Sequence, residues 1–121
     1  MASEVRHRTL FERSADPMFL LDESCKVIEV NEASQSLLNL KPEQVLGTRV
    51  LDFVRPAGRP EFEAALMGAM EGSKIPIFEC QMVPLEGVEL PVDIDVHPVE
   101  IQDHRHLLLH MRDIRWRKAT H

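Results

Sequence analysis

The stretch "MFLLDESCKVIEVNEASQSLL", residues 18–38, decides the fold of this 121-residue chain. Two short apolar runs flank the polar residues DESCK, a pattern typical of a β-hairpin. Asn31 follows the second run directly, where its side chain can accept a hydrogen bond from a backbone N–H two or three residues on. The next segment, EASQSLLNL, places Ala33, Leu37 and Leu40 on one helical stripe. The stretch therefore predicts a hairpin that runs straight into a helix capped by Asn31.

Helical segments surround this hairpin. Residues 5–14, VRHRTLFERS, are predicted to form a short amphipathic helix that ends before Asp16-Pro17, because a residue before proline avoids the helical region. KPEQVLG, residues 41–47, restarts a helical turn with proline at a tolerated first position. The longest predicted helix is PEFEAALMGAME, residues 60–71, with Gly72 placed to cap its end. Its apolar residues have the spacing of one buried face: Phe62, Ala65, Leu66, Ala69 and Met70.

The last third of the chain changes its period from 3.6 to 2. VELPVDIDV, residues 88–96, alternates apolar and polar residues and predicts a long, half-buried strand. IPIFECQMVP at 75–84 and HLLLHMRDI at 106–114 are its predicted neighbours, joined to it by the turns LEGV and IQDH. Helices and strands in separate runs favour an α+β class, with five antiparallel strands and helices over one face.

Composition excludes several kinds of function. Net charge is −6, from 20 acidic and 14 basic residues, whereas nucleic-acid binding requires a basic face. No apolar stretch approaches the length of a membrane span, and the N-terminus lacks the apolar core of a signal peptide. Cys25 and Cys80 lie too far apart in sequence for a metal or redox motif and are expected to be free thiols. We therefore expect a cytoplasmic domain without nucleic-acid or membrane contact.

The sequence also lacks recognisable catalytic motifs. It contains no phosphate-binding loop, GxSxG elbow, CxxC pair or HExxH segment. His104, His106 and His110 are expected to be solvated, because no carboxylate or cysteine completes a metal set at suitable spacing. Asp93 and Asp95 alternate with apolar residues and are expected to face solvent. We expect neither a catalytic nor a metal site.

Several stretches together resemble a known family, the PAS domain. Residues 10–54 are similar in the helix-to-strand segment SADPMFLLD, the hairpin into VIEVNEAS and the KPEQVLG turn. The end, MRDIRWRK at residues 111–118, resembles the Asp-Ile-Thr-x-x-Arg-Lys signature with which many bacterial PAS domains pass into the next module. Arg115 stands where threonine is usual, and Trp116 replaces a usually polar residue. The resemblance covers about residues 7–118.

The resemblance implies a sensory and protein-interaction module with no catalysis of its own. Its fold would be a PAS-like five-stranded antiparallel sheet with short helices and one longer helix over one face. The expected divisions are an N-terminal flank at 1–14, a PAS core at 15–114 and the start of a signalling linker helix at 115–121. A homodimer is expected. Output would leave through the C-terminal strand to an effector such as a histidine kinase or a diguanylate cyclase.

Family members enclose a cavity that holds haem, flavin, a small metabolite or nothing. Here the helix at 60–71 has no histidine for haem, and no Asn-Cys-Arg-Phe-Leu-Gln type segment marks a photoactive flavin site. A bound ligand is therefore expected to be a small organic molecule in a mainly apolar pocket. The candidate lining residues, which are equally candidates for plain core, are Phe53, Phe62, Leu66, Met70 and Phe78.

The resemblance also assigns roles at the two ends of the core. Asn31 matches the family's strand-end asparagine, expected here as a structural cap. The signal exit is expected at Asp113, Ile114, Arg115 and Trp116. Two alternatives stay open: a small α+β cavity enzyme of the isomerase or dehydratase kind, and an interaction module that binds no ligand. The enzyme would need a buried Asp or His facing a pocket.

Overall fold

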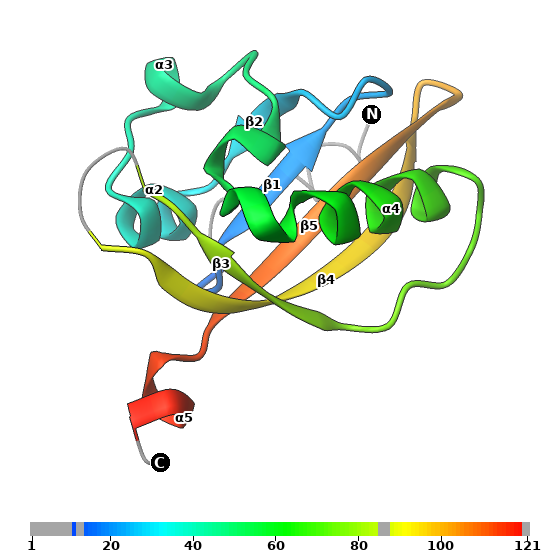
Figure 1. Ribbon diagram of the computed structural model, residues 1–121. Coiled ribbons are helices and arrows are strands. Elements are labelled where there is room, and N and C mark those ends of the chain that lie inside the picture. Colours follow the sequence, from blue (N-terminus) through cyan, green and yellow to red (C-terminus); the bar gives the residue numbers. More distant parts are fainter. Residues whose placement is uncertain (1–10, 12–13, 85–87, 120–121) are drawn as a thin grey trace.

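The structure, a computed structural model, describes residue 11 and residues 14–84 and 88–119 of the chain (Figure 1). The predicted helix at 5–14 therefore lies outside the described residues, except for Phe11 and Ser14. The strands are β1 Met18–Leu21, β2 Val27–Val30, β3 Phe78–Met82, β4 Leu90–Ile101 and β5 His104–Asp113. The α-helices are α2 Glu32–Leu38, α3 Pro42–Val45, α4 Arg59–Met70 and α5 Arg115–Ala119. Two 3-10 turns, η1 Val50–Phe53 and η2 Pro56–Gly58, precede α4.

The strands form one antiparallel sheet in the order β2-β1-β5-β4-β3, which confirms the predicted α+β class. The long β4–β5 hairpin is the centre of the sheet, and β1 joins it by pairing with β5. Helix α4 crosses one face of this sheet, whereas α5 follows the C-terminal end of β5 and points away from the sheet (Figure 1). One face is therefore covered by helix, and the chain exits at the end of a central strand.

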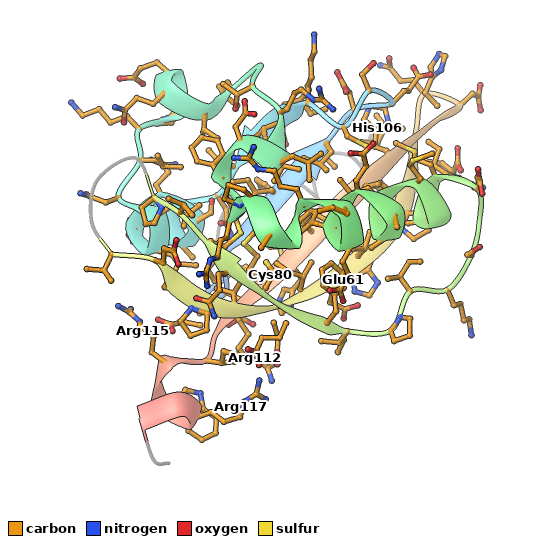
Figure 2. The ribbon with its side chains drawn as sticks, in the orientation of Figure 1. Glu61, Cys80, His106, Arg112, Arg115 and Arg117 are labelled. Atoms are coloured by element: carbon orange, nitrogen blue, oxygen red, sulfur yellow. The ribbon has the colours of Figure 1, made fainter. Side chains whose placement is uncertain are left out.

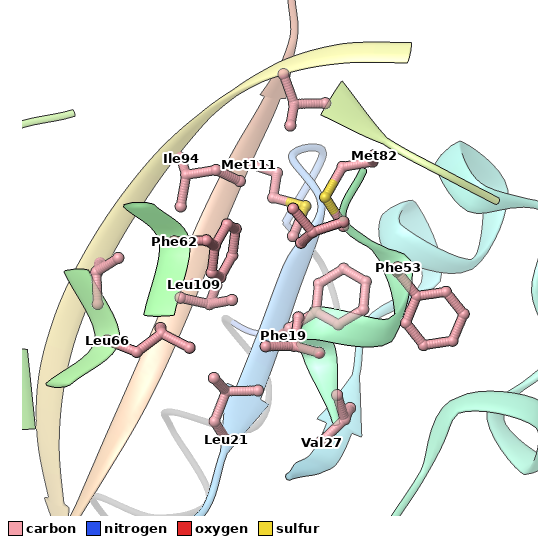
Figure 3. Packing of buried hydrophobic residues seen from close by; sticks show 14 of the residues in the cluster. Phe19, Leu21, Val27, Phe53, Phe62, Leu66, Met82, Ile94, Leu109 and Met111 are labelled. Atoms are coloured by element: carbon pink, nitrogen blue, oxygen red, sulfur yellow. The ribbon is translucent and has the colours of Figure 1, made fainter. Parts of the chain in front are cut away.

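The apolar core lies between α4, the short helices and the covered sheet face (Figure 3). Phe62 and Leu66 of α4 are at most 1% exposed, and Leu109 and Met111 of β5 are fully buried. Alternation along β5 sends these residues inward, which places the intervening His110 and Arg112 on the other face. Their register partners on β4, Asp95 and Asp93, lie on that outer face as well.

In the last third of the chain, the ends of the strands differ from the sequence prediction. Val88 was expected in a strand, but it lies before β4 and is 84% exposed, because the β3–β4 ladder ends at the Met82–Leu90 pair. Strand β3 is also shorter than residues 75–84, since Pro76 and Pro84 cannot donate to a ladder. Of the predicted LEGV turn, residues 85–87 lie outside the described residues. Helix α4 matches its prediction to within one residue, and Gly72 beyond it has a positive φ of 95°.

Candidate functional site

Three of the five predicted pocket residues are buried in the core, and the other two pack against it. Phe53 from η1 and Phe62 and Leu66 from α4 belong to the core cluster (Figure 3). Met70 and Phe78 pack against it half-buried. The rings of Phe62 and Phe78 meet edge to face, with centroids 5.5 Å apart and planes at 84°. All five side chains thus belong to the apolar core or pack against it, and Phe62 and Phe78 are in direct contact. Their role as the lining of a ligand pocket stays a prediction.

An open groove lies elsewhere, beside the end of β5. It is lined by Ser14, Ala15, Asp16, Pro17, Glu32, Ala33, Ser36, Leu37, Arg112 and Asp113. None of the five predicted pocket residues contributes to it. The groove joins the N-terminal flank, the start of α2 and the exit of the sheet, three regions that sequence reasoning did not connect.

Asn31 is the buried tie between the entry of the chain and the hairpin. Its Oδ1 accepts hydrogen bonds from the backbone N–H of Ser34, 3.0 Å away, and of Met18, 2.9 Å away. The first of these bonds confirms the predicted cap of α2. Its Nδ2 donates to the carbonyl oxygens of Phe11 and Asp16, at 3.0 and 2.9 Å. The side chain is therefore fully used, and it fixes the N-terminal flank against β1.

Asp113, the last residue of β5, connects the sheet to α5. Its Oδ1 accepts from the backbone N–H of Arg115, the first residue of α5, at 2.9 Å, and so satisfies one of the free N–H groups at the start of the helix. Both carboxylate oxygens also accept from the Arg115 guanidinium, at 2.6 to 3.1 Å. These side-chain hydrogen bonds are the main reason that the pKa of Asp113 lies below its ordinary value. Arg115, which replaces the usual threonine, thus forms its own pair with the junction carboxylate.

The other exit residues divide into one anchor and one free side chain. Ile114 is 1% exposed, and its backbone N–H donates to the carbonyl oxygen of Pro91, which ties the junction to β4. Trp116 is 67% exposed on α5. The chain therefore turns from strand to helix over a buried isoleucine, and the helix presents its indole to solvent.

Arg117 makes a contact that sequence reasoning missed. Its guanidinium lies 3.0 Å from Asp93 Oδ1 on β4 and 3.8 Å from Glu79 Oε1 on β3. Figure 2 labels Arg115 and Arg117 of α5 and Arg112 near the end of β5. The only sequence signal was that Glu79 and Asp93 fall on the polar side of their strands, which says nothing about which cation reaches them.

The remaining titratable groups form no catalytic arrangement in the described part of the chain. His110 pairs with Asp16 and His104 with Glu23, and no group of three possible ligands could hold a metal ion within residues 14–84 and 88–119. Asp95 pairs with His97 on the outer sheet face, away from the core. Burial raises the pKa of the Cys80 thiol to about 12, which keeps it protonated. None of the helices in the described residues is long and apolar enough to span a membrane.

The strand order, the covering helix and the capped exit define a small α+β domain that passes its chain from a central strand into a helix. The model of the PAS fold family matches residues 11–119, and the chain belongs to this family. No curated protein is significantly similar to it.

Solved structures agree with this assignment at the level of the fold. The PAS domain of an HTR-like protein from Haloarcula marismortui is 23% identical, with a TM-score of 0.75 over 93% of each chain. A PAS domain from Colwellia psychrerythraea is 19% identical, with a TM-score of 0.80 over 93% of this chain and 97% of the other. A domain of a sensory box sensor histidine kinase/response regulator from Geobacter sulfurreducens is 22% identical, with a TM-score of 0.73 over 92% and 94%.

Proposed function

We propose that this PAS domain senses a small organic ligand and relays its state through β5 into α5. The observation that carries the proposal is the junction itself: Ile114 is buried and tied to β4, and Asp113 caps the helix that follows. A change in strand packing near the core therefore moves the start of α5 directly. The effector would be a kinase or cyclase module beyond this segment, in line with the sensor histidine kinase named for one structural neighbour.

The ligand and the dimer belong to the same proposal. An apolar interior that contains Phe62 and Phe78 suits a small organic molecule, and the homodimer would bring two exit helices side by side. A native mass spectrum of freshly purified protein measures both properties at once. Mass in excess of the chain supports a ligand, and twice the chain mass supports a dimer. A bare monomer at micromolar concentration would contradict both.

Asp113→Ala in the full-length protein tests the relay. We expect the effector to lose its dependence on the signal, because the variant removes both the cap of α5 and the pairing with Arg115. Basal effector activity should persist, since the change lies outside any catalytic module. An effector that still responds normally to its signal would rule out this route, and Asp52→Ala, the same change at an exposed carboxylate on η1, is the matched control.

The lowered pKa of Asp113 predicts how the junction depends on pH. A carboxylate with a folded pKa below its unfolded value stabilises the structure above the ordinary carboxyl pKa of 3.8, and loses this effect as pH falls through the lowered value. The α5 cap should therefore hold at neutral pH and open only in strong acid. An NMR titration of the Arg115 amide measures this. A transition at or above pH 3.8 would show that the pairing is absent in solution.

A further inference from the structure

The outer face of the sheet carries two carboxylates in an unfavourable arrangement. Glu79 of β3 stands directly opposite Asp93 of β4 in the antiparallel register. Like charges placed opposite each other on neighbouring strands destabilise a sheet. The structure offsets this repulsion with Arg117, whose guanidinium contacts both carboxylates from α5. Arg112 of β5 also stands opposite Asp93 in the register, so the exit helix adds a second cation, and this one bridges β3 and β4.

The two partners of Arg117 lie on different strands, and both strands touch the core. Glu79 sits between Phe78 and Cys80, which pack against the core cluster from the other side of β3. Asp93 sits between Val92 and Ile94, which are fully buried on β4. Because side chains of one strand alternate between the two faces of the sheet, a shift of β3 caused inside the core also displaces Glu79 on the outside. The distance between the two carboxylates therefore reports the spacing of β3 and β4.

We propose that Arg117 is an inter-strand clamp: it docks α5 on the sheet only while β3 and β4 hold Glu79 and Asp93 together. The Asp113–Arg115 pair lies within the exit segment itself, so it caps α5 but does not respond to β3. Arg117 adds that response, because the guanidinium loses one carboxylate as soon as the strands part. The biological role of the clamp rests on the proposed relay function. The clamp itself can be tested in the isolated chain without any effector.

The side chains are exposed enough to make such a clamp reversible. Arg117 is 43% exposed, Glu79 39% and Asp93 23%. Ion pairs at such positions are weak and are screened by salt. A small structural change is therefore sufficient to release the helix, whereas a deeply buried pair would hold it permanently.

Trp116 makes the test direct, because it is the single tryptophan of the chain and stands on α5 next to the clamp. Its fluorescence anisotropy reports how tightly the helix is held. We expect Arg117→Gln to raise the undocked fraction about two- to fivefold, the size of one exposed pair. Glu79→Gln and Asp93→Asn should each give part of this effect. Lys74→Gln, an equal change of charge at an exposed site, should give none.

A sign reversal separates the clamp from general surface electrostatics. In the wild type, Glu79→Gln removes a partner of Arg117 and should loosen α5. In the Arg117→Gln background it removes a like charge that faces Asp93, without the loss of an Arg117 contact, and should raise the melting temperature. The proposal is overturned if Arg117→Gln leaves the anisotropy unchanged, if only Asp93→Asn has an effect, or if Glu79→Gln lowers the melting temperature in both backgrounds. A failed relay in the full-length protein with these results intact would reject the proposed function but keep the clamp.

Discussion

Replacing Asn31 by alanine should lower the free energy of unfolding by about 3–5 kcal/mol, a loss that few polar side chains produce. The amide is 1% exposed and makes four hydrogen bonds, all to backbone groups. Alanine takes this partner from all four groups, of which the Asp16 carbonyl keeps a hydrogen bond from the Ser14 hydroxyl, and each buried group left unsatisfied costs about 1–3 kcal/mol. Water that enters the vacated space recovers part of the sum, so the expected loss is below the simple total. Urea denaturation measures it.

Ser34→Ala is the matched control, because Ser34 is also 1% exposed and its hydroxyl makes a single hydrogen bond, to the carbonyl oxygen of Asn31. It should cost only about 1 kcal/mol, the net contribution of a typical hydrogen bond. If Asn31→Ala costs no more than Ser34→Ala, then the tie between the N-terminal flank and β1 is not formed in solution.

The same residue shows how far sequence reasoning reached. Its cap of α2 depends on a donor three residues away and was predictable from strand-then-helix patterning. Its bonds to Phe11 and Asp16, twenty and fifteen residues away, depend on how the flank folds back on the sheet. No local pattern encodes that return, so the residue was predicted as a cap and not as the tie it forms.

At the exit site, too, the contact between near neighbours in sequence was predictable and the long-range contact was not. The Asp113–Arg115 contact spans two residues and lies within a signature visible in the sequence. The Arg117–Asp93 contact spans 24 residues and requires the register of the sheet and the direction of α5. Asp93 was predicted to face solvent, and it does lie on the outer face. Its partner, Arg117, belongs to a basic segment at the C-terminal end, and the sequence does not show that this segment reaches Asp93. Alternation assigns a side chain to a face of the sheet without saying what covers that face.

Phe62→Ala tests whether the interior around α4 is a filled core. Phe62 is fully buried and contacts Phe78 edge to face, so its removal deletes a large apolar volume and an aromatic pair. We expect a loss of about 3–5 kcal/mol in urea denaturation. Met67→Ala, on the same helix but 56% exposed, is the control and should change stability by less than about 0.5 kcal/mol.

The cost of Phe62→Ala and its rescue distinguish a filled core from a ligand pocket. In a filled core the variant opens a new apolar cavity, which stays dry and binds a small aromatic such as toluene. Toluene should then raise the melting temperature of the variant but not that of the wild type, since a ligand that binds only the folded state stabilises it. In a pre-existing pocket, Phe62 packs against fewer atoms, its removal costs less than in a filled core, and toluene stabilises the wild type as well. The second pattern would establish Phe62 as a lining residue of the sensory pocket, whereas the first would move the search for the ligand site to the groove beside Asp113.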